Sequence, residues 1–349
     1  MELLSVTMND GVMPRSEIEG KDNSSEDKSN YKIVRKGDMV YNSMRMWQGA
    51  NGISPCDGIV SPAYTVLMPK QEISNGYFAA LFKSANLINE FRKNSQGMTS
   101  DTWNLKYPQI KTIKVLIPSV SEQEKVSELF SVLDARIAAQ AQLVEALKKY
   151  KRGVVKAVLS KQIRFVDNSE NYYSEWSECT LQEAVDFLDG QRKPLESADR
   201  AKRKGKYPYY GASGIIDYID DYIFDEPLLL LGEDGANIIN RSSPLCFIAT
   251  GKYWVNNHAH VMRPKAGQNI KFICELLESL DYTRYNTGTA QPKLNQEKCR
   301  QIELMLPTYN EQCKIADLLS IFDQKADIEQ NKLDDLLRCK KGLLQQLFI

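Results

Sequence analysis

The chain has 349 residues, a length typical of two domains rather than one core. Lysine plus arginine equals aspartate plus glutamate, at 45 each, which argues against a protein that coats polyanions with its whole surface. Seven cysteines without a C-x-x-C pair predict reduced thiols in a cytoplasmic protein, and no apolar run approaches the roughly 20 residues that a membrane span needs.

The first part of the chain, residues 1–118, is predicted to form a mixed α/β domain. It starts abruptly at "MELLSVTMNDGVMP", without the opening segment that residues 176–190 give to the second half, so we expect this domain to be incomplete at its N-terminus. The stretch "YNSMRMWQGANGI" predicts an apolar strand and a loop, and "IKVLIP" predicts a second strand. Arginine, glutamine and asparagine can read base edges, so the loop candidates are Arg45, Gln48 and Asn51.

A long helix is predicted next, and its opening sequence occurs twice in the chain. "IPSVSEQEKVSELFSVLDARI" begins at Ile117 and "LPTYNEQCKIADLLSIFDQKA" begins at Leu306, in register at an offset of 189 residues. That period is too long for a solenoid and indicates a duplicated module. Ser121 and Asn310 are the candidate N-caps, each followed by a glutamate in the first turn.

Both helices carry apolar residues on a seven-residue pattern, which predicts a coiled-coil seam. In the first helix the stripe comprises Val126, Phe130, Leu133, Ile137, Val144, Leu147, Val154 and Val158. In the second it comprises Ile315, Leu319, Phe322, Ala326, Leu333, Leu336, Leu343 and Leu347. Gln140 with Glu329, and Lys151 with Lys340, interrupt both stripes. A helix of about 38 residues spans roughly 57 Å. The two helices therefore either fix the distance between two domains or only hold the domains together.

The second globule, residues 166–307, opens with the strand-and-helix segment from Trp176 to Gly190. A cationic stretch follows, and its side chains can neutralise phosphates, although a solvated charged loop is the plain alternative. The DNA-binding candidates here are Arg192, Lys193, Lys202, Arg203, Lys204 and Lys206.

Loops later in this globule supply further candidates for base contacts. They are Asn237, Asn240, Arg241, Asn257, Gln291 and Lys293. The two histidines, His258 and His260, share one face of a predicted strand. They are interpreted as structural residues, as residues near a DNA face, or as a metal pair that has no obvious third ligand.

Signatures of catalysis are missing from the sequence. "SPAY" at 61–64 differs at one position from the amine-binding motif of DNA methyltransferases, and no G-x-G occurs in the chain. "ATGKYW" does not match a phosphate-binding loop. The carboxylates of "GEDG" at 232–235 have no lysine at strand spacing for nuclease chemistry. We therefore expect a chain that does not itself cut or methylate DNA.

These features together resemble the DNA-specificity (S) subunit of type I restriction–modification enzymes. The carriers are the two P-x-x-x-E-Q-x-K-[VI] helix starts at Pro118 and Pro307, and the spacing of Trp176, Leu181 and Gly190. A further carrier is the Gly-Thr-x-Gln-x-x-Leu stretch made by Gly288, Thr289, Gln291 and Leu294. The resemblance spans essentially the whole chain, and the duplicated architecture is its most specific part.

The resemblance implies an α+β fold of two target-recognition domains, each followed by a long helix, with the helices packed as an antiparallel coiled-coil spacer. The expected segments are 1–118, helix 119–165, 166–307 and helix 308–349. It implies a non-enzymatic subunit of bacterial defence that reads a bipartite double-stranded DNA target. It also implies docking of two methyltransferase (M) subunits and of restriction (R) subunits, with S-adenosylmethionine, ATP and magnesium on those partners. The alternatives are a silent or recombining cassette that only makes protein contacts, and a DNA-modifying enzyme in its own right.

Overall fold

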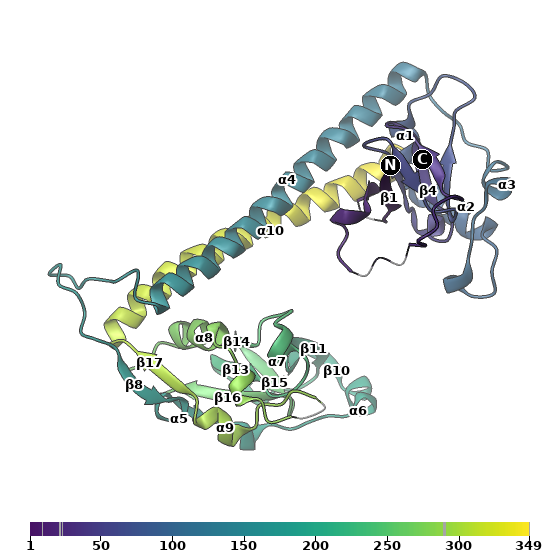
Figure 1. Cartoon of the computed structure of the whole chain (residues 1–349). Helices are drawn as coiled ribbons and strands as arrows, with labels where there is room; N and C mark the ends of the chain where they lie inside the picture. The colour runs from purple at the N-terminus through teal and green to yellow at the C-terminus, as the bar shows by residue number, and fades with distance from the viewer. Residues whose placement is uncertain (9, 21, 23, 289–290, 349) are drawn as a thin grey trace. The chain divides into compact units, whose positions relative to one another are not determined.

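The computed structural model describes residues 1–8, 10–20, 22, 24–288 and 291–348, and it divides into two compact units. Unit 1 comprises residues 1–144 and 328–349, and unit 2 comprises residues 145–327. Helix α4 (Val120–Leu159) begins in unit 1 and ends in unit 2, whereas α10 (Tyr309–Gln346) begins in unit 2 and ends in unit 1 (Figure 1). The predicted α+β class is confirmed. Among the described helices, none has a stretch long and apolar enough to cross a membrane.

Unit 1 contains two small sheets and several short helices. One sheet has the order β2-β1-β6-β3, from Val12–Pro14, Glu2–Val6, Gly58–Val60 and Lys32–Val34. The other has the order β5-β4-β7, from Asn51–Ile53, Met39–Asn42 and Tyr64–Leu67. The helices are η1 (Arg15–Glu17), η2 (Met46–Gln48), α1 (Asn75–Leu81), α2 (Ala85–Asn94), η3 (Ser100–Thr102) and α3 (Tyr107–Ile110).

The strand predicted at 113–118 in unit 1 is wrong, because no strand forms there. Side chains in this segment still alternate, with Val115 and Ile117 half-buried and Leu116 98% exposed. In unit 2 the equivalent strand β17 (Glu303–Leu306) pairs antiparallel with β8 (Ser177–Thr180). The sequence pattern is therefore that of a strand, but no neighbouring strand is present in the described part of unit 1 to complete a ladder.

The described residues of unit 2 form three sheets. Their orders are β11-β10-β15-β12, β14-β13-β16-β9 and β17-β8. The remaining strands are β9 (Val185–Phe187), β10 (Lys204–Gly211), β11 (Gly214–Ile219), β12 (Phe224–Asp225), β13 (Leu228–Gly232), β14 (Cys246–Ala249), β15 (Lys252–Val255) and β16 (Ala259–Pro264). The helices are α5 (Leu181–Ala184), η4 (Asp189–Gln191), α6 (Ser197–Lys202), α7 (Asn237–Asn240), α8 (Ile270–Ser279), η5 (Thr283–Tyr285) and α9 (Gln296–Arg300).

The core of unit 2 lies between the sheet of β13 and helix α8. Strand β13 is buried along its length because it is central in its sheet. Helix α8 is capped by Asn269, whose side chain accepts the Phe272 backbone N–H, and it directs a buried apolar face at this sheet. The same core includes Val155 and Val158 from the end of α4.

The glutamine in each repeated helix opening explains why that motif occurs twice. Gln123 donates to the Pro118 carbonyl at 2.9 Å, and Gln312 donates to the Pro307 carbonyl at 3.0 Å. The side-chain oxygen of each glutamine accepts a backbone N–H from the N-cap residue of a short helix. Ser74, which caps α1, donates to Gln123 at 3.0 Å, and Asn269, which caps α8, donates to Gln312 at 2.9 Å. Both side chains are buried, so each motif fastens a long helix to its globule.

The predicted N-caps are displaced by two residues. The helices begin at Val120 and Tyr309, so Ser121 and Asn310 lie inside the first turn. Ser119 precedes α4, and the Glu122 carboxylate accepts both its backbone N–H (3.2 Å) and its hydroxyl (2.7 Å). The serine that donates twice to a glutamate three residues later marks the start of the helix.

The predicted seam runs along both helices within each unit. Every apolar position of the first stripe is buried or half-buried, and so is the second stripe as far as Leu343. Leu347 departs from the prediction, since it is 44% exposed while its neighbour Phe348 is 6% exposed. Phe348 follows the end of α10 at Gln346, so it no longer obeys the helical period.

The polar residues that interrupt the stripes pair across the seam and define an antiparallel register. Gln140 donates to the backbone oxygen (2.9 Å) and the carboxylate (2.7 Å) of Glu329, the residue 189 positions later. In unit 1, Lys340 contacts Asp134 at 2.5 Å. In unit 2 the equivalent pair, with the helices exchanged, is Lys151 and Asp323 at 2.6 Å. Polar pairs of this kind beside an apolar seam favour one register because any slip would leave them without partners.

The carboxyl end of α10 closes the core of unit 1. The Phe348 ring stacks on Phe130 with centroids 6.0 Å apart and packs edge-on against Tyr77 at 5.4 Å. Its backbone oxygen accepts the side-chain amide of Asn86 at 3.3 Å.

We expect Phe348→Ala to lower the free energy of unfolding of unit 1 by roughly 3 kcal/mol, because it removes a buried ring from between two aromatic neighbours. Leu347→Ala is the matched control, with an expected change below about 0.5 kcal/mol because that side chain is exposed. Denaturant titration read by amide exchange of unit 1 measures both. Equal losses for the two variants would contradict the assignment of Phe348 to the core.

Candidate nucleic-acid interface

Three loops of unit 2 meet where β13 ends and β16 begins. The Glu233 backbone N–H donates to the His258 carbonyl at 2.8 Å, and the Leu294 N–H donates to the Glu233 carbonyl at 2.7 Å. Gly235 adds a bond to the Pro292 carbonyl at 3.1 Å. These main-chain bonds fasten loops that are far apart in the sequence into one surface.

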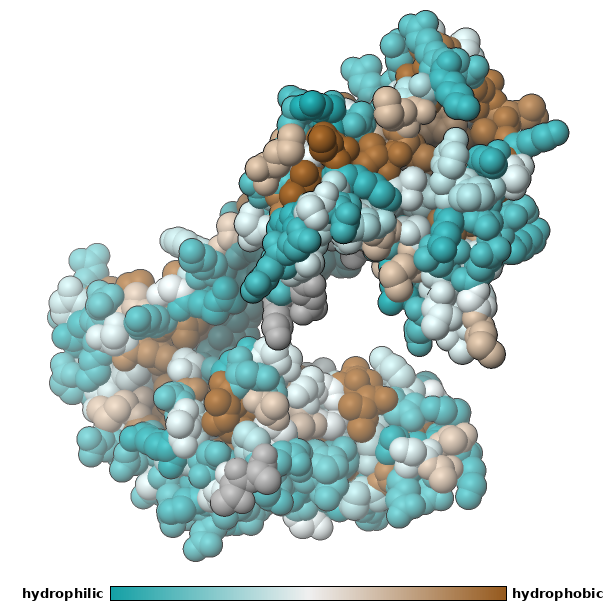
Figure 2. Space-filling view, turned by 45° about the vertical axis from the view of Figure 1, so that its right-hand side comes forward, coloured by the Kyte–Doolittle hydropathy of each residue, from teal (hydrophilic) through white to brown (hydrophobic). Residues whose placement is uncertain are grey.

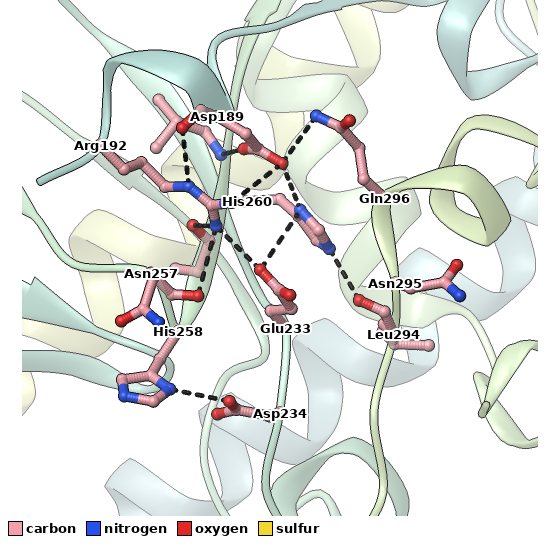
Figure 3. A network of polar contacts seen from close by, with 12 residues as sticks. Asp189, Arg192, Glu233, Asp234, Asn257, His258, His260, Leu294, Asn295 and Gln296 are labelled. Atoms are coloured by element: carbon pink, nitrogen blue, oxygen red, sulfur yellow. Dashed lines mark hydrogen bonds and ion pairs between the residues drawn. The ribbon is translucent and has the colours of Figure 1, made fainter. Parts of the chain in front are cut away.

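Asp189 connects this group of loops (Figure 3). Its two carboxylate oxygens accept hydrogen bonds from the Val261 N–H at 2.8 Å, the His260 ring at 2.7 Å and the Gln296 amide at 2.8 Å. Burial opposes the charged carboxylate, but the bonds from His260 and Val261 outweigh it and lower the pKa of Asp189. The carboxylate is therefore ionised near neutral pH.

His260 is positioned to be doubly protonated. Its Nδ1 faces the Asp189 carboxylate at 2.7 Å and its Nε2 faces the Leu294 carbonyl at 2.8 Å, so both nitrogens face acceptors. Burial favours the neutral ring and is the largest single influence, but the bond and charge of Asp189 together with the neighbouring Cys299 outweigh burial and raise the pKa of His260 to about 10. The result is a buried imidazolium–carboxylate pair that links β16 to the loop after β9.

A second ion pair extends the network toward the surface. Arg192 donates to Glu233 at 2.8 Å and to the Ala259 carbonyl at 2.8 Å, and its guanidinium lies 3.4 Å from Asp189. Lys293 approaches the other oxygen of Glu233 at 3.4 Å. Asp189, Arg192, Glu233, His260 and Gln296 are called the anchoring network below.

Several polar side chains stand exposed around the anchoring network. Four of them are predicted DNA contacts, and they are called the rim: Lys193, Asn257, Gln291 and Lys293. His258 lies beside them, half exposed, with its Nδ1 at 2.7 Å from Asp234. A lysine suits phosphate, and asparagine or glutamine suits the edge of adenine, so the rim combines both kinds of contact.

The cationic stretch from Arg192 to Lys206 is mostly neutralised by nearby carboxylates. Arg203 pairs with Asp220 at 2.9 Å and its guanidinium lies 4.9 Å from the Trp254 ring centroid. Lys204 contacts Asp217 at 2.6 Å, and Lys202 lies 3.7 Å from Asp199. Arg192 is half-buried and pairs with Glu233. Contact of these cations with DNA phosphates stays a prediction. Within the described part of the chain, only Lys193 and Lys206 of the predicted cations here have no carboxylate partner.

Two of the predicted DNA contacts in the loop after β13, Asn237 and Arg241, stabilise the loop itself. The Asn237 side chain donates to the Ser243 carbonyl (3.0 Å) and accepts the Ser243 N–H (2.9 Å). Arg241 adopts a positive φ of 52° and contacts the Glu278 carboxylate at 2.7 Å. Asn240 is exposed and only accepts the Ser242 N–H at 3.3 Å, so it alone of these three can reach a ligand without breaking the loop.

In unit 1 the predicted contacts lie around η2. Arg45 is exposed and Gln48 is half-buried. Asn51 is fully buried in β5, where its amide donates to the Gly49 carbonyl at 3.1 Å, so its side chain does not reach the surface. The residue type alone could not predict that the glycine-rich turn buries the Asn51 side chain.

The sequence analysis missed the anchoring role of Asp189 and Gln296. It found no lysine that would give the carboxylates at 232–235 nuclease chemistry, and it left His260 as a structural residue, a residue near a DNA face or half of a metal pair. The structure places Glu233 and His260 in the ion-pair network. The available signal was a histidine in a buried strand, whose ring nitrogens need hydrogen-bond partners. Thr289, part of one motif, lies outside the described residues. In the described ranges, no group of three His, Cys, Asp or Glu side chains is arranged to hold a metal.

Replacement of His260 by Gln tests the imidazolium. The pKa is about 10 in the folded chain and 6.5 for an ordinary histidine, so the stabilising contribution is complete below pH 6.5 and is lost as pH rises toward 10. Between these limits, the unfolding free energy of unit 2 should fall by up to roughly 1.4 kcal/mol per pH unit relative to the variant. His258→Gln is the matched control and should retain the wild-type slope. Parallel curves for wild type and His260→Gln would contradict the charged assignment.

Comparison with known proteins places these features in a family. The model of the type I restriction modification DNA specificity domain matches residues 5–149 and 173–338. A type I restriction enzyme specificity subunit from Haemophilus influenzae is 32% identical over 145 residues, which is 42% of this chain and 36% of that protein. The MjaVIII specificity subunit of Methanocaldococcus jannaschii is 23% identical over 346 residues, covering 90% of this chain and 79% of that one.

Among solved structures, the S subunit of a type I restriction–modification system from M. genitalium has the same fold. Its TM-score is 0.60 at 19% identity, with 91% of this chain and 84% of that chain covered. The matched stretch spans only about a third of the length of the Haemophilus relative. The family model, however, covers both halves of the chain, and the chain belongs to the type I restriction modification DNA specificity domain family.

Proposed function

We propose that the chain is the sequence-reading subunit of a type I restriction–modification complex, with one half of a bipartite double-stranded DNA target read by each unit. The observation that carries the proposal is the rim of unit 2, where exposed Lys193, Asn257, Gln291 and Lys293 surround a buried network of opposite charges. Rigid support of this kind suits direct reading of bases, because a base contact gains little if its loop must first be ordered.

Unit 1 would read the other half-site by the same general means but with different side chains. Exposed Arg45 directly precedes η2 and half-buried Gln48 is its last residue. Trp47 packs edge-on against Trp103 at 5.1 Å. Arginine favours guanine and glutamine favours adenine in the major groove. Different side chains on two related units would give a target with two unlike halves, as expected for a bipartite sequence.

The chemistry in this proposal belongs to partner subunits. S-adenosylmethionine would be held by M subunits, and ATP with magnesium by R subunits, while this chain acts without catalysis. Support comes from the absence in the sequence of a cofactor loop and from the use of Glu233 and His260 in structural ion pairs. The alternatives remain a silent cassette that only makes protein contacts and, less favoured by these pairs, an enzyme.

The outward faces of the long helices would dock the M subunits. Val132 on α4 and Ile321 on α10 are both exposed, and the repeat pairs them with each other. Leu129 and Leu143 continue the apolar face of α4, and Figure 2 shows apolar side chains on the surface of unit 1. One such face on each helix fits two M subunits, one for each copy of the repeat.

Substitutions in the rim should separate affinity from specificity. Lys193→Ala should weaken binding to all sequences alike and reduce the salt slope by about 0.9, since one phosphate contact is lost. Asn257→Ala or Gln291→Ala should reduce discrimination at one base pair by about 1–3 kcal/mol. Gel shifts of the M-bound complex on a randomised target library measure both. Lys204→Ala, whose ammonium already pairs with Asp217, is the control and should change neither.

The docking faces can be tested separately from DNA reading. Val132→Asp and Ile321→Asp should each remove one M subunit from the complex, because a charge is placed on an apolar contact. The mass of the assembled complex gives the number of M subunits bound. Two M subunits retained by the double variant would exclude these faces, and Asp substitution of exposed Tyr172 serves as the control.

A further inference from the structure

Helix α1 of unit 1 and helix α8 of unit 2 hold equivalent positions beside the long helices. Each begins after an N-cap residue, Ser74 or Asn269, whose backbone N–H donates to the glutamine of the repeated helix opening. The two short helices differ at their second and sixth residues, which are glycine and alanine in α1 but lysine and glutamate in α8. This difference changes what lies between each short helix and the long helices.

In unit 2 the two charged residues of α8 complete a cluster of ion pairs with the long helices. The Glu275 carboxylate bridges two ammonium groups, that of Lys151 from α4 at 2.6 Å and that of Lys271 at 2.6 Å. Asp323 of α10 contacts Lys151 at 2.6 Å and also contacts Lys271. Each lysine therefore has two carboxylate partners, and these side chains occupy the space between the three helices.

In unit 1 only half of this cluster is present. Lys340 of α10 pairs with Asp134 of α4 at 2.5 Å, but Gly76 and Ala80 of α1 bring no charged group to them. The space beside them is a cavity of about 740 Å³, and the described residues that line it all belong to unit 1. Gly76 stays small because a Cβ atom there would lie 1.9 Å from the Ser127 hydroxyl oxygen. Cavities of this size are typical of small-molecule sites.

A second lysine lines the cavity without a carboxylate partner. Lys83 directly follows the C-cap of α1 and is half-buried, and among the described residues its ammonium has no hydrogen bond or ion pair. Burial and then the charge of Lys340 lower the pKa of Lys83, and the charges of Asp134 and Asp10 oppose them only in part. The cavity therefore presents an ammonium group that a further carboxylate would stabilise.

The remaining wall of the cavity is largely apolar. It is contributed by two strands of unit 1 and by the faces of α4 and α10 that point toward α1, among them Val12, Ile53, Phe130, Ile137 and Leu344. A ligand with a charged group at one end and an apolar body matches this division, because the body gains from leaving water while the lysines receive the charge.

We propose that this cavity binds a small organic acid, whose carboxylate bridges Lys83 and Lys340 as Glu275 bridges the two lysines of unit 2. The apolar body of the acid packs against the walls from α4 and α10. The ligand thus supplies from outside the carboxylate that α8 supplies from within the chain. The inference concerns unit 1 alone and does not depend on DNA reading.

Phenylbutyrate is the probe, because it joins one carboxylate to an apolar body. Added to the full chain, it should bind saturably with one molecule per chain, measured by calorimetry. Phenylbutanol has the same ring and chain without the charge, and it should bind roughly tenfold more weakly or less because it makes no charge-assisted hydrogen bond. Inorganic phosphate carries charge without an apolar body and should also bind at least about tenfold more weakly.

Trace acetylation followed by peptide mass mapping locates the bound probe. An amine is acetylated only in its neutral form, so the lowered pKa makes Lys83 reactive in the free chain. Saturating phenylbutyrate should slow acetylation of Lys83 by roughly fivefold or more, because a carboxylate partner favours the ammonium form. Exposed Lys111 is the internal reference, and its rate should not change.

Two substitutions test the residues of the site. Lys83→Met removes the charge and should weaken phenylbutyrate about tenfold while phenylbutanol is unaffected. Ala80→Glu places the residue of α8 in α1 and should abolish phenylbutyrate binding, because a carboxylate of the chain then occupies the same place. Lys111→Met is the matched control and should bind as the wild type does. Amide exchange of α2 in each free variant shows that unit 1 is folded.

Four results from folded chains would overturn the proposal. The first is the absence of saturable phenylbutyrate binding. The second is equal binding of phenylbutanol, which would show an apolar site without a role for charge. The third is phosphate binding as tight as that of phenylbutyrate, which would show lysines that accept any anion. The fourth is phenylbutyrate binding that persists in Lys83→Met or in Ala80→Glu, which would place the ligand elsewhere.

Discussion

The antiparallel contact between α4 and α10 is the constraint on which the rest of the structure depends. Each globule has its core closed by the end of the helix that starts at the other globule. Phe348 fills the core of unit 1 between Phe130 and Tyr77, and Val155 with Val158 enters the core of unit 2. Neither copy of the repeat is therefore a self-contained folding unit, although each is continuous in sequence. Loss of helix pairing would open both cores at the same time.

The polar residues of the seam contribute specificity rather than strength. A seam of leucine and valine alone tolerates a shift by one heptad, because apolar side chains find similar neighbours after the shift. Gln140 with Glu329, Lys151 with Asp323, and Lys340 with Asp134 have no equivalent partners after such a shift. Lys151 also contacts Glu275 of α8 at 2.6 Å, so the register of the helices is tied to the globule of unit 2. The register of the helices is thus set by polar pairs within an apolar seam.

The same physical logic supports the candidate interface. Asp189 pairs with His260, and Arg192 pairs with Glu233, away from solvent. The free-energy penalty of burying these charges stays small only while every partner remains in place. They hold loops from four parts of the chain in one arrangement and leave the rim residues free to differ without loss of the fold. A recognition surface whose support is separate from its contacts can change target while it keeps its structure. The described residues of unit 1 form no such network. There the Ser43 carbonyl accepts the Leu105 N–H as the Glu233 carbonyl accepts the Leu294 N–H, and Thr65 pairs with β4 as His260 pairs with β13.

The sequence by itself determined the duplication, the α+β class, the heptad stripes and the positions at which polar residues interrupt them. These features are periodic or repeated, so local spacing carries them. The tertiary structure alone decided which cations are available, because Arg203 and Lys204 are neutralised by aspartates from the neighbouring strand β11 and the loop that follows it. It also decided that Asn51 is buried and that the strand-like "IKVLIP" stays unpaired. Charge neutralisation, burial and strand pairing each require a second segment of the chain, and the spacing within one segment does not say which partner lies opposite it.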